Sequence, residues 1–257
     1  MPPHLHGLDC LPHQVSGSQD GTARLWGVLQ RACLVCYQAH LSPIWGVAFA
    51  PIGPYFATAG LDRTLRVWRT DLPQPIRLFT NHLADVRCCA FHPNVSYIAS
   101  GSDDAAVRVW DLQQAKCVRL LCRHGHAGAV TCLAFRPDGV CLASGGEDGC
   151  LILWHLPSAS SRRRLVAHQR PLWSLAFSQE GAQLATSADD CTLTVWDALG
   201  AARAREGGAL TQGNDEPPAH SDELLIARLH SKHTPIVTVH YSRTNLLLAA
   251  GAFNPPP

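Results

Sequence analysis

The amino-acid sequence predicts an all-β protein built from repeated units of four short strands. A tryptophan returns about every 42 residues, as Trp26, Trp68, Trp110, Trp154 and Trp196, with successive intervals of 42, 42, 44 and 42 residues. Short runs of apolar and β-branched residues, separated by turn residues, fill the space between these tryptophans. A period of this length indicates a propeller, solenoid or array in which each repeat is one structural unit.

Three further residue types keep fixed positions before each tryptophan. An Asp lies six residues before it, a Ser or Thr ten residues before it and, in four repeats, a His 28 residues before it. The four complete sets are His40, Thr58, Asp62 and Trp68; His82, Ser100, Asp104 and Trp110; His126, Ser144, Asp148 and Trp154; and His168, Thr186, Asp190 and Trp196. The first tryptophan has Ser16 and Asp20, but the matching His would fall before Met1.

One repeat shows how the four strands are expected to follow one another. Strands are predicted at 130–135, 140–144, 150–154 and 164–168, and the Pro-Asp-Gly turn that ends at Gly139 separates the first two. A period of about 40 to 45 residues with four strands, a leading His and a closing Trp resembles the WD40 repeat, in which each unit is one blade of a β-propeller. The Trp-Asp pair that names this repeat is kept at Trp110-Asp111 and Trp196-Asp197.

The repeats predict four complete blades with a partial blade at each end. Three strands are expected before the first complete blade and two after the last, at 14–18, 22–26, 33–37, 236–241 and 246–250. These five strands could join into one blade of a strained five-bladed ring. Alternatively, the chain forms an incomplete ring with exposed strand edges, which is the interpretation that we favour.

Two segments fall outside the repeat pattern. Residues 1–10 are predicted to be irregular, and the propeller is predicted to span 11–257. Residues 198–222 lack apolar periodicity and are expected to form a flexible insertion between the third and fourth strands of the last complete blade. Residues 224–229 would then supply that fourth strand.

Composition argues against several classes of function. The 257 residues are 16% charged and carry a formal net charge of +1, whereas nucleic-acid binding requires a basic excess, so that no direct nucleic-acid binding is expected. No run of 18 apolar residues is present, so we expect no membrane span. Cys33 and Cys36 form a C-x-x-C without the second pair that a zinc site needs. No metal, cofactor or small-molecule ligand is predicted.

The recurring Ser or Thr, His and Asp also resemble the parts of a hydrolase triad. A catalytic site needs one nucleophile in one cleft, whereas this set recurs in four successive repeats. We therefore interpret it as a structural network, in which Asp accepts a hydrogen bond from His, His bonds the hydroxyl and the hydroxyl accepts one from the indole N–H. No catalytic residue is predicted, and the protein is expected not to be an enzyme.

Two sets of residues are candidates for binding a partner protein. The residue directly before the turn Asp is acidic in three consecutive repeats, as Asp103, Glu147 and Asp189. These carboxylates are expected to gather on one face and receive a basic segment, or else they are ordinary turn residues. Five residues after each His stand Trp45, Arg87, Thr131 and Trp173. Trp and Arg are enriched in interface hot spots, so Trp45, Arg87 and Trp173 are expected to bind a partner.

Several stretches resemble one particular family, the WD40 domain of the TBP-associated factor that is the scaffold subunit of TFIID and has a paralogue in SAGA. They include Asn81-His-Leu-Ala-Asp-Val86, Phe91-His-Pro-Asn94, Thr234-Pro-Ile-Val237 and the segment from Arg243 to Ala252. The resemblance covers nearly the whole chain from about residue 11.

This resemblance implies a nuclear, non-enzymatic scaffold that acts in assembly of the RNA polymerase II pre-initiation complex. Its partners would be TBP-associated factors, including histone-fold subunits. The family's propeller has seven blades and follows an N-terminal dimerisation region, from which this chain departs. A SAGA-type coactivator subunit, or a generic WD40 adaptor such as a ubiquitin-ligase substrate receptor, is the alternative.

Overall fold

The computed structural model describes residues 13–122, 125–158, 160–203, 224–231 and 234–251. These residues form 21 β-strands and one short helix, α1 (Ala198–Arg203), so the predicted all-β class is confirmed. In this part of the chain no helix is long and apolar enough to cross a membrane. The predicted irregular segment 1–10 lies outside the described residues.

The strands pair with their sequence neighbours into six sheets. The four complete sheets are β4 (Ile44–Phe49), β5 (Tyr55–Gly60), β6 (Leu65–Arg69) and β7 (Arg77–Phe79); β8 (Val86–Phe91), β9 (Tyr97–Ser102), β10 (Val107–Asp111) and β11 (Lys116–Leu121); β12 (Val130–Phe135), β13 (Cys141–Gly146), β14 (Cys150–His155) and β15 (Ser160–Val166); and β16 (Leu172–Phe177), β17 (Gln183–Ala188), β18 (Thr192–Asp197) and β19 (Leu225–His230). The partial sheets are β1 (His13–Gly17), β2 (Thr22–Gly27) and β3 (Ala32–Gln38), and β20 (Ile236–Tyr241) with β21 (Leu247–Gly251). The predicted pattern of three, sixteen and two strands is thus confirmed.

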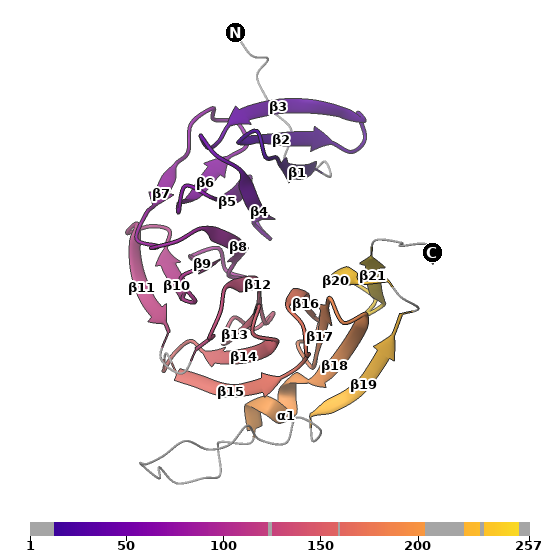
Figure 1. The fold of residues 1–257 in the computed structure, drawn as a ribbon. Helices are drawn as coiled ribbons and strands as arrows, with labels where there is room; N and C mark the ends of the chain where they lie inside the picture. The colour runs from indigo at the N-terminus through magenta and orange to yellow at the C-terminus, as the bar shows by residue number, and fades with distance from the viewer. Residues whose placement is uncertain (1–12, 123–124, 159, 204–223, 232–233, 252–257) are drawn as a thin grey trace. The chain divides into compact units, whose positions relative to one another are not determined.

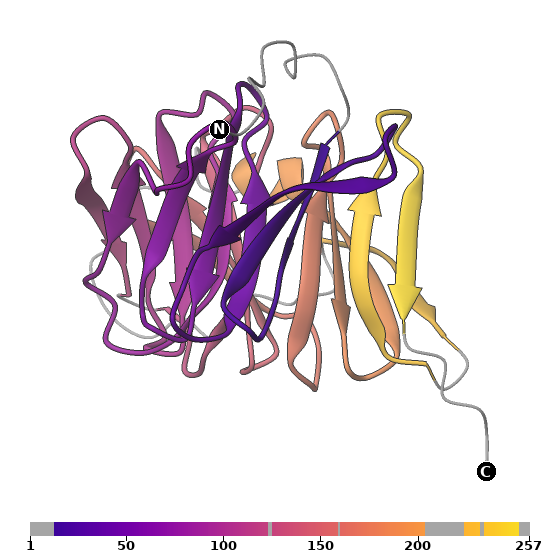
Figure 2. The same ribbon diagram turned by 90° about the horizontal axis from the view of Figure 1, so that it is seen from above.

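The chain divides into two compact units, of which the first comprises residues 1–104 and 108–119 and the second residues 105–107 and 120–257. Within the first unit β1 contacts β4 and β4 contacts β8, and within the second β12 contacts β16 and β16 contacts β20. Successive sheets of each unit therefore lie side by side, as blades of a propeller do, and the first strands β4 and β8, β12 and β16, and β16 and β20 are adjacent (Figures 1 and 2). The predicted incomplete ring concerns the placement of the two units and stays a prediction.

The hydrophobic core lies between successive sheets of the same unit. In the first unit Leu25 and Tyr37 from one sheet pack with Phe56 and Trp68 from the next. The rings of Phe56 and Trp68 are stacked with their centroids 6.0 Å apart. Because the second strand of each complete sheet is covered on both faces and both edges, five or six of its residues are buried. This burial explains why these strands read as continuous apolar and small residues rather than as an alternating pattern.

The structure corrects two of the predicted boundaries. The first six residues of the predicted flexible insertion form helix α1, because the carboxylate of Asp197 caps it by accepting hydrogen bonds from the N–H groups of Leu199 (3.0 Å) and Gly200 (2.9 Å). Residues 204–222 of that insertion lie outside the described residues. Strand β15 spans Ser160–Val166, so it begins and ends earlier than the predicted 164–168.

The turn between the first and second strands places one residue in the left-handed backbone region. That residue is Gly53 (φ 83°), Gly139 (φ 74°), Gly181 (φ 69°) or Asn245 (φ 56°) in four sheets, and Val95 (φ 57°) in the fifth. A β-branched residue is strained at positive φ. We expect Gly139→Val to lower the free energy of unfolding by about 1 kcal/mol in urea denaturation, because Val would have to adopt the left-handed conformation that Gly139 adopts freely. A stabilising Gly139→Val would contradict the explanation.

Candidate interaction site

Each recurring set of His, hydroxyl, Asp and Trp meets inside its own sheet. In the sheet of β4–β7, His40 Nδ1 lies 2.8 Å from Asp62 Oδ2 and His40 Nε2 lies 2.7 Å from Thr58 Oγ1. The indole of Trp68 donates to the same Thr58 oxygen at 3.0 Å. The four side chains therefore form one continuous chain of hydrogen bonds from the indole to the carboxylate.

The same three contacts recur in the other complete sheets. In the order His–Asp, His–hydroxyl and Trp–hydroxyl, they measure 2.9, 2.7 and 2.8 Å for His82, Asp104, Ser100 and Trp110; 3.0, 2.8 and 2.8 Å for His126, Asp148, Ser144 and Trp154; and 3.0, 2.9 and 3.1 Å for His168, Asp190, Thr186 and Trp196. The structure thus brings together all sixteen residues that the spacing singled out.

The direction of the hydrogen bonds follows from the chemistry of the groups. An ionised carboxylate only accepts, so Nδ1 of each His carries the proton and donates to Asp, which leaves Nε2 as an acceptor for the hydroxyl proton. Burial lowers the pKa of His40, His82 and His168, so these imidazoles are neutral at pH 7. Burial alone would raise the pKa of Asp148, but hydrogen bonds from His126 and the Ala127 N–H lower it to about 2.

This geometry does not suit nucleophilic catalysis. The four hydroxyl residues Thr58, Ser100, Ser144 and Thr186 are fully buried, with no exposed surface. Each hydroxyl already accepts the indole proton, and its own proton points to the imidazole. A nucleophile must be accessible to its substrate, and these hydroxyls are not. They therefore have a structural role inside the sheets. Among the described residues, no group of three or more His, Cys, Asp or Glu could hold a metal ion.

The buried histidines predict a loss of stability in acid. Because the folded-state pKa of His40, His82 and His168 lies below the unfolded value of about 6.5, the unfolded chain binds more protons once the pH falls through that value. We therefore expect the free energy of unfolding to fall between about pH 7.5 and pH 5.5 in urea titrations. A His82→Gln variant should be less stable overall but show a shallower pH slope, and a pH-independent wild type would contradict the prediction.

A β-bulge in the first strand of five sheets determines which side chains are turned outward. The pairing register with the second strand skips one residue in β4, β8, β12, β16 and β20. The skipped residues are Trp45, Arg87, Thr131, Trp173 and Val237, so the four predicted positions are bulge residues and Val237 is a fifth. Trp45, Trp173 and Val237 are 45%, 44% and 49% exposed. Bulges commonly re-aim a side chain in this way.

Three of the predicted binding residues form one cluster in the first unit. The guanidinium of Arg87 lies over the ring of Trp45, 5.4 Å from its centroid. The same guanidinium pairs with both carboxylate oxygens of Asp103, at 2.7 and 3.0 Å. Such bidentate pairs are strong and directional. Arg87 thus balances the charge of Asp103, and the exposed Leu61 occupies the place of Asp103 in the preceding sheet.

The second unit carries the remaining predicted residues in a different setting. The Thr131 hydroxyl donates to the backbone oxygen of Leu172 at 2.6 Å, so it joins two neighbouring first strands. Trp173 is half exposed, and Glu147 and Asp189 are exposed. Because Asp103 belongs to the first unit, the predicted gathering of all three acidic residues on one face stays a prediction.

The complete sheets each have four antiparallel strands, and neighbouring sheets of one unit pack with their first strands together. This arrangement is typical of β-propeller repeat proteins. Their exposed turns and bulges are the usual places where partners bind. Four segments of the chain match the family model described as WD domain, G-beta repeat, at residues 31–69, 73–111, 115–155 and 159–197. These matches cover more than half of the 257 residues. The protein belongs to the WD40 repeat family, and its four-stranded sheets are the blades of a β-propeller repeat.

Proposed function

We propose that this WD40 protein is a non-enzymatic scaffold in assembly of the RNA polymerase II pre-initiation complex. WD40 repeats imply a protein-interaction role, which the family membership supports. The more specific role rests on the resemblance to the WD40 domain of the TFIID scaffold subunit. Its partners would be TBP-associated factors, including histone-fold subunits, and the protein would act in the nucleus without contacting nucleic acid directly.

The observation that supports this role is the segment from Asn81 to Val86, where the resemblance is most specific. The fold uses His82 for the polar network and Val86 for the core. It leaves Leu83 exposed, and that residue contributes only its backbone N–H, which donates to Asp104 Oδ2 at 3.0 Å. A leucine is not needed for that backbone contact. The exposed Leu83 side chain is therefore available to contact a partner protein.

Affinity purification from a nuclear extract tests the proposal. We expect the tagged protein to recover TBP-associated factors with histone folds, and a Leu83→Ser variant to recover less of them at an unchanged melting temperature. Exposed Leu78 on β7 supplies the matched control, because Leu78→Ser removes a similar side chain from outside the family-specific segment. Recovery of SAGA subunits without TBP would favour the SAGA-type alternative. Recovery of cullin adaptors would overturn the transcription proposal.

A further inference from the structure

The first sheet differs from the complete sheets in having no described strand at the place of their first strand. β1 pairs with β2, and Ser16 stands opposite Arg24 as Thr58 stands opposite Arg66 in the next sheet. β1 is therefore a second strand by its position. Most of β5 is buried, whereas Gln14, Ser16 and Gly17 of β1 are exposed. In the described part of the chain, the edge of β1 opposite β2 is unpaired.

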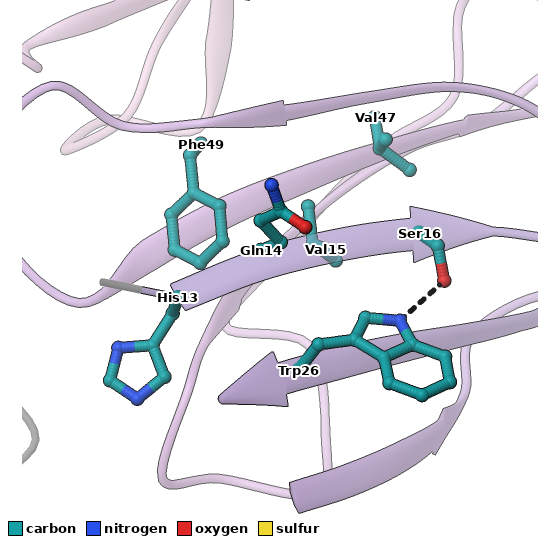
Figure 3. Close-up of a pocket in the computed structure, with 7 residues that line it drawn as sticks. All are labelled: His13, Gln14, Val15, Ser16, Trp26, Val47 and Phe49. Atoms are coloured by element: carbon teal, nitrogen blue, oxygen red, sulfur yellow. Dashed lines mark hydrogen bonds between the residues drawn. The ribbon is translucent and has the colours of Figure 1, made fainter. Parts of the chain in front are cut away.

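A cavity of about 460 Å³ lies along this edge (Figure 3). Its apolar wall consists of Val15 and Trp26 from the first sheet and of Val47 and Phe49 from the first strand of the next. Its polar wall includes Ser16 and the imidazole of His13, whose Nε2 atom is buried without a hydrogen-bond partner. The space thus has apolar surface, polar groups and strand backbone along one side.

The polar network of this sheet is half assembled. The Trp26 indole donates to Ser16 Oγ at 2.9 Å, as in the complete sheets (Figure 3). The Asp20 carboxylate accepts hydrogen bonds from the hydroxyl (2.7 Å) and the N–H (2.9 Å) of Thr22. Asp62 accepts the same two bonds from Thr64 in the next sheet. In the complete sheets a His joins the hydroxyl to the carboxylate, but no described His joins Ser16 to Asp20. The Asp20 side chain is accordingly 51% exposed, against 20% for Asp62.

The other sheets show what chemistry fits this place. Their first strands begin with an aliphatic residue and end, five residues later, with Phe or Tyr, as in β4, β8, β12, β16 and β20. In the four complete sheets a His precedes the aliphatic residue by four positions. The same phase along this chain would use residues 2–7, Pro-Pro-His-Leu-His-Gly. Two prolines there have no N–H for the ladder, and Gly7 stands at the aromatic position.

We propose that a separate polypeptide binds the edge of β1 by strand addition and supplies the first strand of this sheet. The bound segment carries His, three residues, an aliphatic residue, four residues and an aromatic residue. Its backbone pairs with β1, its apolar side chains enter the cavity, and its imidazole joins Ser16 to Asp20. Main-chain bonds then provide affinity and the side chains provide specificity.

Titration with a synthetic peptide of residues 166–179 tests this proposal, because that segment holds His168 and all of β16. We expect saturable binding of one peptide per chain in isothermal calorimetry. A peptide with His168→Ala should bind about tenfold more weakly to the wild type. The His168→Ala peptide should bind a Ser16→Ala protein about as well as it binds the wild type, because the imidazole and the hydroxyl contribute to affinity through one shared hydrogen bond. A scrambled peptide that binds equally well would overturn the proposal.

The other partial sheet provides the matched control. Leu248 on β21 is also exposed next to a strand edge, so a Leu248→Asp variant should bind the peptide as the wild type does. Loss of binding in that variant would place the peptide at β21 and contradict the proposal. We expect light scattering to show a monomer in the absence of peptide. A dimer that the peptide does not dissociate would mean that a second copy of the chain covers β1, which would contradict the proposal. None of these outcomes bears on the nuclear partners, so failure here leaves the proposed function standing.

Discussion

Replacing Asp104 by Ala is expected to lower the free energy of unfolding by about 3 kcal/mol. The Asp104 carboxylate is nearly buried and accepts hydrogen bonds from His82 Nδ1 at 2.9 Å and from the Leu83 N–H at 3.0 Å. Without it the imidazole proton is left inside the sheet with no acceptor, and the chain from Trp110 through Ser100 to His82 loses its end. Urea denaturation followed by circular dichroism measures the change.

Asp20 offers a matched control for this prediction. It occupies the same turn position and holds Thr22, but no described His donates to it. We therefore expect Asp20→Ala to lower the free energy of unfolding much less than Asp104→Ala does, because only bonds within an exposed turn are lost. Equal losses in Asp104→Ala and Asp20→Ala would show that the His–Asp contact adds nothing to stability.

Replacing Trp154 by Ala is expected to cost about 4 kcal/mol, the usual loss for truncating a fully buried aromatic residue. Trp154 is 1% exposed in β14, and its indole donates to Ser144 Oγ at 2.8 Å. The substitution removes the packing of the ring and one hydrogen bond to a buried hydroxyl. Thermal unfolding and urea denaturation should both report the loss.

Trp26 is the matching residue of the partial first sheet, and it makes the same hydrogen bond to Ser16 while its ring is only partly covered. Trp26→Ala should therefore cost about half as much as Trp154→Ala. A larger loss at Trp26 than at Trp154 would contradict the view that the complete sheets hold the core.

The strands and the polar networks could be predicted from the sequence because their residue types recur at fixed offsets. Thr58 bonds both His40 and Trp68. These bonds require the same number of residues between the partners in every repeat, and that number can be read from the sequence. The same four-residue set was found in every complete sheet. The fourth strands are harder to place, because they lie at the edge of each sheet and keep no invariant residue, as the misplaced start of β15 shows.

The details of the candidate site could not be predicted, because they depend on backbone irregularity and on neighbouring sheets. A β-bulge adds one residue to a strand without requiring a particular residue type, so the side chain of Val237 gave no sign that it lies at the same bulge position as Trp173. Asp103 was predicted as one of three equivalent acidic residues, yet Arg87 pairs with it. Arg87 meets Trp45 only because β4 and β8 are adjacent.

We propose that the buried networks stabilise the sheets while the exposed bulge residues bind partner proteins. Quantitative affinity purification of the wild type and of a Trp45→Ala, Trp173→Ala double variant tests it most directly, with Leu78→Ala as the control. Both tryptophans are half exposed, so the melting temperature should stay unchanged in every variant. We expect a loss of co-purified proteins of about tenfold or more in the double variant and no loss in the control. Undiminished recovery of the same partners by the folded double variant would contradict it.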